Sequence, residues 1–237
     1  MGQDFEVPLE ATVGAAPEEV WEAISTGPGI DSWFLGRSEV ADGVVRTAFG
    51  PFDMPPSHVT AAEPGRHLAH SSDKADDGRF VAYEFMIEGR DRGSTLVRMV
   101  TSGFLPGDDW QDEFEAMSRG LELYFATLVE YLGHFAGRVA TPLTEFGPPV
   151  ADWAPAWDRL YATLGGEPAV GDRVAVNGVE GVVYFRNAQT LGIRSGAAMY
   201  RLMQGFGGSL IASHLLFEGG DDQGPRWRSW LAELPAG

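Results

Sequence analysis

The residues that could carry acid–base chemistry are few, and no motif brings them together. General acid–base catalysis needs an acid and a base that converge in one cavity. The candidates are Tyr83, Glu84, Arg98, Tyr124 and His58. The sequence contains no zinc-protease helix signature, no phosphate-binding loop and no nucleophile elbow. We therefore predict no catalytic residues. The pattern favours a protein that is not an enzyme, and an enzyme is kept as an alternative.

The histidines do not have the spacing of a metal site. His67 and His70 fall on one predicted short strand, but their odd separation places them on opposite faces. The chain has no cysteine, which excludes thiolate ligands, thiol catalysis and disulfides. We predict neither a metal nor a cofactor. The full set of histidines is His58, His67, His70, His134 and His214.

The longest periodic pattern predicts an amphipathic helix from Trp110 to Leu132. Apolar residues recur there at steps of three and four, so they share one face of a helix. That face must be buried against another element of the fold. It consists of Trp110, Phe114, Met117, Leu121, Tyr124, Leu128 and Leu132.

Two strands before this helix, 80–88 and 94–102, predict the clearest hairpin. A turn near Asp91 pairs Glu84 with Arg98, and we interpret that pair as a surface ion pair rather than a ligand contact. The other face of the hairpin is mostly apolar and is predicted to lie under the long helix. It carries Val81, Tyr83, Phe85, Ile87, Thr95, Val97, Met99 and Thr101.

The earlier part of the chain predicts an edge strand, a helix and further hairpins. Apolar residues alternate from Phe5 to Val13, and Pro8 favours an edge position for that strand. Pro17 opens a helix, and a further short helical turn carries Trp33 and Phe34. Asp42 and Gly43 have the composition of a tight hairpin turn.

Composition bounds the organisation and the partners of the chain. The 237 residues predict a first domain over 1–136, a linker over 137–151 rich in glycine and proline, and a small α+β unit over 152–237. The net charge of −17 disfavours nucleic acid and anionic membranes as partners. No apolar run is long enough to span a membrane. The absence of cysteine and of a secretory leader favours a cytoplasmic location.

Several segments together resemble a known family. They are Ala15–Ile24, Ile30–Phe34, Val59–Leu68, Thr101–Phe104 and the long helix that follows. In this order and spacing, residues 5–135 resemble the activator of heat-shock-protein-90 ATPase homologue-like group of the START-like (SRPBCC, helix-grip, Bet v-like) superfamily. The resemblance implies an α+β fold in which an antiparallel sheet of six or seven strands wraps around a long C-terminal helix. The family often has histidine where this chain has Thr101.

Three functions follow from the residues and the resemblance. The preferred one is non-enzymatic binding of a small hydrophobic molecule in a cavity between the long helix and the sheet. The second is a protein-interaction module like a co-chaperone, with a chaperone or a second copy of the chain as partner. The third is an enzyme like a polyketide cyclase or hydrolase. The predicted ligand-binding residues are Trp33, Phe34, Met54, Tyr83, Phe85, Val97, Met99, Trp110, Phe114, Met117 and Leu121.

Overall fold

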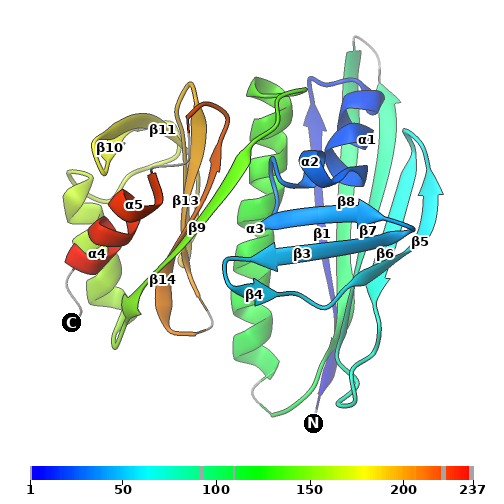
Figure 1. Cartoon of the computed structure of the whole chain (residues 1–237), viewed down its shortest axis with the longest axis horizontal. Helices are drawn as coiled ribbons and strands as arrows, with labels where there is room; N and C mark the ends of the chain where they lie inside the picture. Colours follow the sequence, from blue (N-terminus) through cyan, green and yellow to red (C-terminus); the bar gives the residue numbers. More distant parts are fainter. Residues whose placement is uncertain (1, 91–92, 109, 206, 220–222, 235–237) are drawn as a thin grey trace. The chain divides into compact units, whose positions relative to one another are not determined.

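The computed structural model describes residues 2–90, 93–108, 110–205, 207–219 and 223–234. The chain divides into two compact units, Met1–Val139 and Ala140–Gly237, and each is described by itself. Each unit combines an antiparallel sheet with a few helices, which confirms the α+β class (Figure 1). Within the described part of the chain, no helix has the length and apolar character that crossing a membrane requires.

The first unit is an eight-stranded antiparallel sheet with three described helices. The strand order is β1-β8-β7-β6-β5-β3-β2, and the short β4 pairs with β3. The elements are β1 Gln3–Val13, α1 Pro17–Ser25, α2 Gly27–Ile30, β2 Arg37–Ala41, β3 Val44–Phe49, β4 Phe52–Asp53, β5 Ser57–Glu63, β6 His67–Ser72, β7 Phe80–Arg90, β8 Ser94–Leu105 and α3 Trp110–His134.

The apolar stripe of α3 packs against β1 and β8 (Figure 1). Leu121 and Leu128 are buried, and the ring of Phe114 lies 5.9 Å from the ring of Phe5 on β1. Strand β1 lies at the edge of the sheet. Proline has no backbone N–H to donate to a neighbouring strand, so an edge strand tolerates Pro8 better than a central strand would. The predicted helix and the predicted edge strand are both confirmed.

The β7–β8 hairpin has a register two residues away from the predicted one. Glu84 pairs with Val100, and Arg98 pairs with Met86. A shift of two residues keeps every side chain on its predicted face, because side chains alternate with a period of two. The predicted ion pair between Glu84 and Arg98 is wrong, since Glu84 instead meets the Nε2 atom of His67 at 2.8 Å. The predicted turn residue, Asp91, lies outside the described residues.

The turn between β2 and β3 has the backbone that its sequence predicts. Asp42 and Gly43 have φ angles of 51° and 73°. Two consecutive positive φ angles define the tight turn that matches the twist of paired strands. The hairpin brings Thr47 opposite Ser38, and their hydroxyl oxygens lie 3.0 Å apart.

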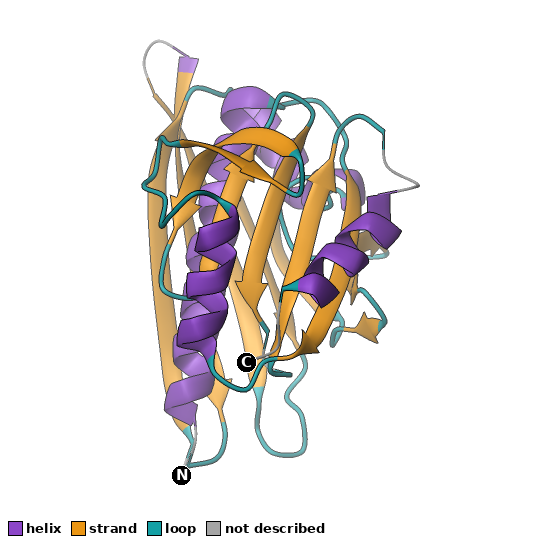
Figure 2. Ribbon diagram, turned by 90° about the vertical axis from the view of Figure 1, so that its left-hand side faces the viewer, coloured by secondary structure: helices purple, strands orange, loops and turns teal. Residues whose placement is uncertain are grey.

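The second unit is a six-stranded antiparallel sheet in the order β10-β11-β12-β13-β14-β9. Helices α4 and α5 pack on a shared core through Trp157 and Leu160 of α4 and Trp227 and Leu231 of α5 (Figure 2). The elements are β9 Thr141–Pro149, α4 Trp153–Thr163, β10 Arg173–Val176, β11 Val179–Arg186, β12 Thr190–Arg194, β13 Ala198–Gln204, β14 Ser209–Leu216 and α5 Gln223–Glu233.

The segment predicted as a linker, 137–151, contains strand β9. This strand pairs with β14 from Thr141 to Pro149. Its prolines resemble linker composition in the sequence, but β9 lies at the edge of its sheet, where proline is tolerated. The compact second unit therefore begins at Ala140 rather than at residue 152.

Gly103 is closely packed, so a substitution at this residue tests how β1, β8 and β7 pack together. A Cβ atom on Gly103 would lie 2.1 Å from the carbonyl oxygen of Phe80 and 3.0 Å from the ring of Phe5. We expect Gly103→Ala to lower the free energy of unfolding by roughly 2 kcal/mol, because the neighbouring strand must move.

The matched control is Gly133→Ala near the end of α3, where a Cβ atom would meet nothing within 4 Å. That change should raise the free energy of unfolding by roughly 0.5–1 kcal/mol through helix propensity. Urea unfolding of both variants measures the two effects. Equal stability of Gly103→Ala and the parent protein would contradict the packing described.

Candidate functional site

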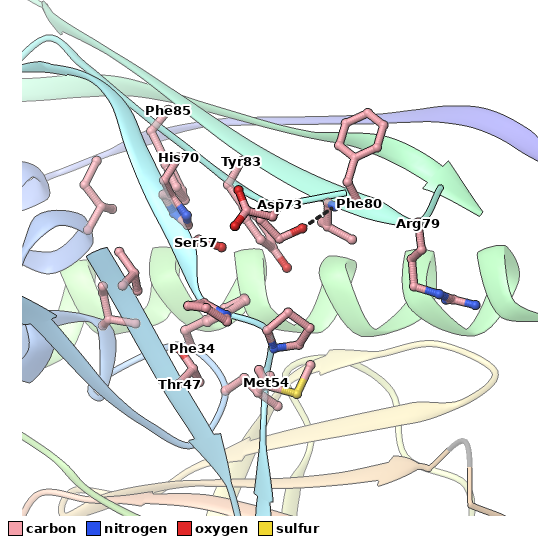
Figure 3. A pocket seen from close by; sticks show the side chains of 18 of the residues that line it. Phe34, Thr47, Met54, Ser57, His70, Asp73, Arg79, Phe80, Tyr83 and Phe85 are labelled. Atoms are coloured by element: carbon pink, nitrogen blue, oxygen red, sulfur yellow. Dashed lines mark hydrogen bonds between the residues drawn. The ribbon is translucent and has the colours of Figure 1, made fainter. Parts of the chain in front are cut away.

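A cavity of about 350 Å³ lies in the first unit (Figure 3). Strands β3, β5, β6 and β7 form one part of its wall. Helices α1 and α2, the segments 33–35, 54–56 and 73–75, and Arg79 form the rest. The lining is mainly apolar and aromatic, with a few polar side chains, which is the usual composition of small-molecule sites.

Aromatic rings from three parts of the first unit meet beside the cavity. The ring centroid of Phe34 lies 5.0 Å from that of Trp33, 5.7 Å from that of Tyr83 on β7 and 5.1 Å from that of Tyr124 on α3. Trp33 also meets Phe85 edge to face at 6.1 Å. Such tilted and edge-to-face pairs stabilise aromatic clusters beyond their buried area.

Hydrogen bonds around α2 fix the position of Trp33 and Phe34. The backbone N–H groups of both residues donate to the carbonyl of Ile30, which extends α2 as a turn. The indole N–H of Trp33 donates to the carbonyl of Ala23 on α1 at 2.9 Å. The backbone N–H of Ser38 donates to the carboxylate of Asp31 and so closes the loop that carries the two rings.

His70 contributes a polar side chain to the cavity wall. It belongs to a row of directly paired residues on neighbouring strands, Val59, His70, Tyr83 and Thr101. Its ring stacks on that of Tyr83, with centroids 5.2 Å apart, and points toward the cavity in Figure 3. Its buried Nδ1 atom has no hydrogen-bond partner within the part of the chain that the structure describes.

Burial keeps the polar groups of this row uncharged. It lowers the pKa of His70 to about 4. Burial, assisted by the nearby Tyr124, raises the pKa of Tyr83 to about 12. Both groups are neutral at pH 7, so they can make hydrogen bonds but provide no charge. On the other side of Tyr83, the buried hydroxyl of Thr101 also lacks a partner.

The loop between β6 and β7 forms part of the cavity rim. Asp73 meets Nε2 of His58 at 3.4 Å, and Arg79 forms an ion pair with Glu113 on α3. The ammonium group of Lys74 lies 5.1 Å from the ring centroid of Phe80. These contacts attach the loop to β5, to α3 and to the start of β7.

Five of the predicted ligand-binding residues line the cavity, and six do not. Those that line it are Trp33, Phe34, Met54, Tyr83 and Phe85. Among the described residues, the lining includes none from α3, whose apolar face packs directly on β1 and β8. The cavity is therefore displaced from the predicted space between the long helix and the sheet. The residues outside its lining are Val97, Met99, Trp110, Phe114, Met117 and Leu121.

His70, Ser57 and Lys74 are among the cavity residues that the sequence did not predict. Strand alternation carried a signal for His70, because it lies two residues after the buried Leu68 and shares its face. The acid–base candidates do not gather in the cavity, since the lining includes Tyr83 but not Glu84, Arg98, Tyr124 or His58. His58 meets Asp73, and the pair formed by Glu84 and His67 lies on the opposite face of the sheet. Within the described ranges, no group of three or more potential metal ligands is present.

Comparisons with known proteins show similarity to solved structures only. No family model and no curated protein matches the chain. Protein MLL2253 from Mesorhizobium loti is 21% identical, covers 54% of this chain and 96% of its own, and has a TM-score of 0.46. The Aha1 dimer protein from Colwellia psychrerythraea is 17% identical over 54% of this chain and 96% of its own, with a TM-score of 0.44. DynU16, from the dynemicin biosynthetic locus, is 20% identical over 98% of this chain and 96% of its own, with a TM-score of 0.46.

An Aha1 protein, the kind of protein that the sequence resembles, is thus among the similar structures. All three identities lie below 25% and all three TM-scores below 0.5. These similarities carry no conclusion on ligand, activity or partners.

Because burial lowers the pKa of His70, its imidazole should lower the free energy of unfolding increasingly as the pH falls. The unfolded state binds this proton below pH 6.5 and the folded state only below about 4, so stability is lost as the pH falls through that window. We expect His70→Phe to raise the free energy of unfolding by about 1 kcal/mol at pH 7, because it removes a buried unpaired nitrogen. The advantage of the variant should grow by about 3 kcal/mol between pH 7 and pH 4.

Chemical unfolding of both proteins across this pH range measures the difference. Burial raises the pKa of Asp31 to about 6, which gives a trend of opposite sign between pH 3.8 and 6. That contribution is present in both proteins and cancels in the comparison. A difference that does not vary with pH would contradict a buried, neutral His70.

Proposed function

We propose that the first unit is a helix-grip domain that binds a small, largely aromatic molecule without transforming it. The ligand would occupy the cavity of about 350 Å³ and make its main polar contact with His70. The observation that carries this proposal is the imidazole of His70, which stacks on Tyr83 in the wall of an open aromatic cavity and whose buried Nδ1 atom has no hydrogen-bond partner among the described residues.

The size and the wall of the cavity support an aromatic ligand. A volume of about 350 Å³ lies within the roughly 300–1,000 Å³ range of small-molecule sites. Phe34, Tyr83 and Phe85 present ring surfaces that suit another flat ring. Since the rings are held by α2, β7 and α3 together, the walls have little freedom to collapse into the space.

The polar partner of the ligand follows from the state of His70. A neutral imidazole has one donor nitrogen and one acceptor nitrogen. A buried polar atom without a partner costs roughly 1–3 kcal/mol. A ligand hydroxyl or carbonyl that hydrogen-bonds to the ring would recover part of this cost, which favours an aromatic molecule with one such group.

The same groups favour binding over catalysis. At neutral pH, His70 holds no proton to give as an imidazolium acid, and Tyr83 is too weak an acid to lose its proton, because burial moves each pKa away from 7. The lining includes the carboxylate of Asp73, which meets Nε2 of His58 at 3.4 Å. No acid–base pair among the described cavity residues is therefore tuned for proton transfer.

Filling the cavity should abolish binding of a neutral aromatic probe. Ser57 lines the cavity from β5, while Thr60 on the same strand is exposed. We expect phenylnaphthylamine to bind the parent protein with a rise in fluorescence. Ser57→Trp should weaken that binding at least roughly tenfold, because an indole takes the volume of the probe.

Thr60→Trp adds the same side chain to the outer surface and should leave the affinity unchanged. Fluorescence titration and a test of probe-to-protein stoichiometry measure both variants. Probe binding that is absent from the parent protein, or equal in Ser57→Trp and Thr60→Trp, would rule out the cavity as the binding site.

A further inference from the structure

Lys74 is the single lysine of a chain with 34 acidic residues, and it lines the cavity. It is exposed, and its ammonium group lies over the ring of Phe80 at 5.1 Å from the centroid. A cation over an aromatic face is attracted by the ring electrons, which holds the ammonium group near the start of β7. The charge is thus placed at the rim of the aromatic cavity.

Among the described residues, no acidic residue of the same loop forms an ion pair with Lys74. Asp73 meets Nε2 of His58 at 3.4 Å, and Asp77 lies 3.9 Å from Nε of Arg79. Asp76 is exposed to solvent. Within the part of the chain that the structure describes, the interaction found for the Lys74 ammonium is its contact with Phe80, and no ion pair is present.

The other cation of the lining is already engaged. Arg79 forms an ion pair with Glu113 of α3 and lies near Asp77. Its charge is therefore compensated by the protein. Lys74 is the lining cation whose charge is available to a bound molecule.

We propose that the ligand of this cavity is an aromatic anion, with its ring among the aromatic side chains and its carboxylate or other acidic group paired with Lys74 at the rim. This inference rests on the proposed function. The net charge of −17 repels anions at long range. A cation at the cavity is therefore needed to bind the acidic group of such a ligand. An ammonium group on a flexible stem can follow that group without a fixed geometry.

Two probes that differ by one anionic group test the inference. Anilinonaphthalene sulfonate carries a sulfonate on the ring system of phenylnaphthylamine, which is neutral. Only the signal that Ser57→Trp removes is counted, so that binding outside the cavity is excluded. We expect Lys74→Gln to weaken binding of the sulfonate probe roughly fivefold at low salt and to leave binding of the neutral probe unchanged. The difference should shrink as salt is added.

Arg98→Gln is the matched control, because it removes the same charge from an exposed position on the outer face of β8. It should change the affinity of neither probe. Equal affinities of Lys74→Gln and the parent protein for the sulfonate probe would overturn the role of Lys74. An equal loss of affinity for both probes would do the same. Neither result would overturn the proposed function. Failure of the neutral probe to bind the parent cavity would overturn the proposed function, and this inference with it.

Discussion

The contact of Phe34 with Tyr83 and Tyr124 is the interaction on which the first unit depends most. It joins the loop after α2, the middle of the sheet and the long helix at ring distances of 5.1 and 5.7 Å. Flat, rigid side chains in such a junction prevent each element from moving onto the others, so the space beside them stays open. The cavity is thus a consequence of how the core is packed, and two of these rings, those of Phe34 and Tyr83, form part of its wall.

Burial then decides the chemistry available in that wall. It moves the pKa values of His70 and Tyr83 in opposite directions, to about 4 and about 12, and leaves both groups neutral. A neutral pair can select a ligand by hydrogen bonding but cannot stabilise a developing charge as an ion would. Lys74, a lining cation for which the described residues provide no ion pair, lies at the exposed rim instead. The site therefore separates an apolar interior from a charged entrance, which suits an amphipathic molecule.

Periodicity predicted the helix from Trp110, the edge strand with Pro8 and the apolar face that carries Tyr83 and Phe85, because those patterns repeat locally. It could not place the cavity, since which apolar surfaces touch and which leave a gap depends on side-chain volumes summed over distant elements. Met117 and Leu121 have the right pattern but lie outside the lining of the cavity. His70 was missed because alternation with Leu68 could give its face of the strand but not its place beside a cavity, and strand β9 was missed because its prolines resemble a linker.

The central claim is that an aromatic molecule with one hydrogen-bonding group occupies the cavity and contacts His70. A crystal structure of the protein with naphthol tests it directly. The account predicts the naphthol ring between Phe34 and Tyr83, with its hydroxyl oxygen within roughly 3.2 Å of a ring nitrogen of His70. Naphthol bound elsewhere on the chain, or a cavity filled by side chains in the presence of saturating naphthol, would contradict it.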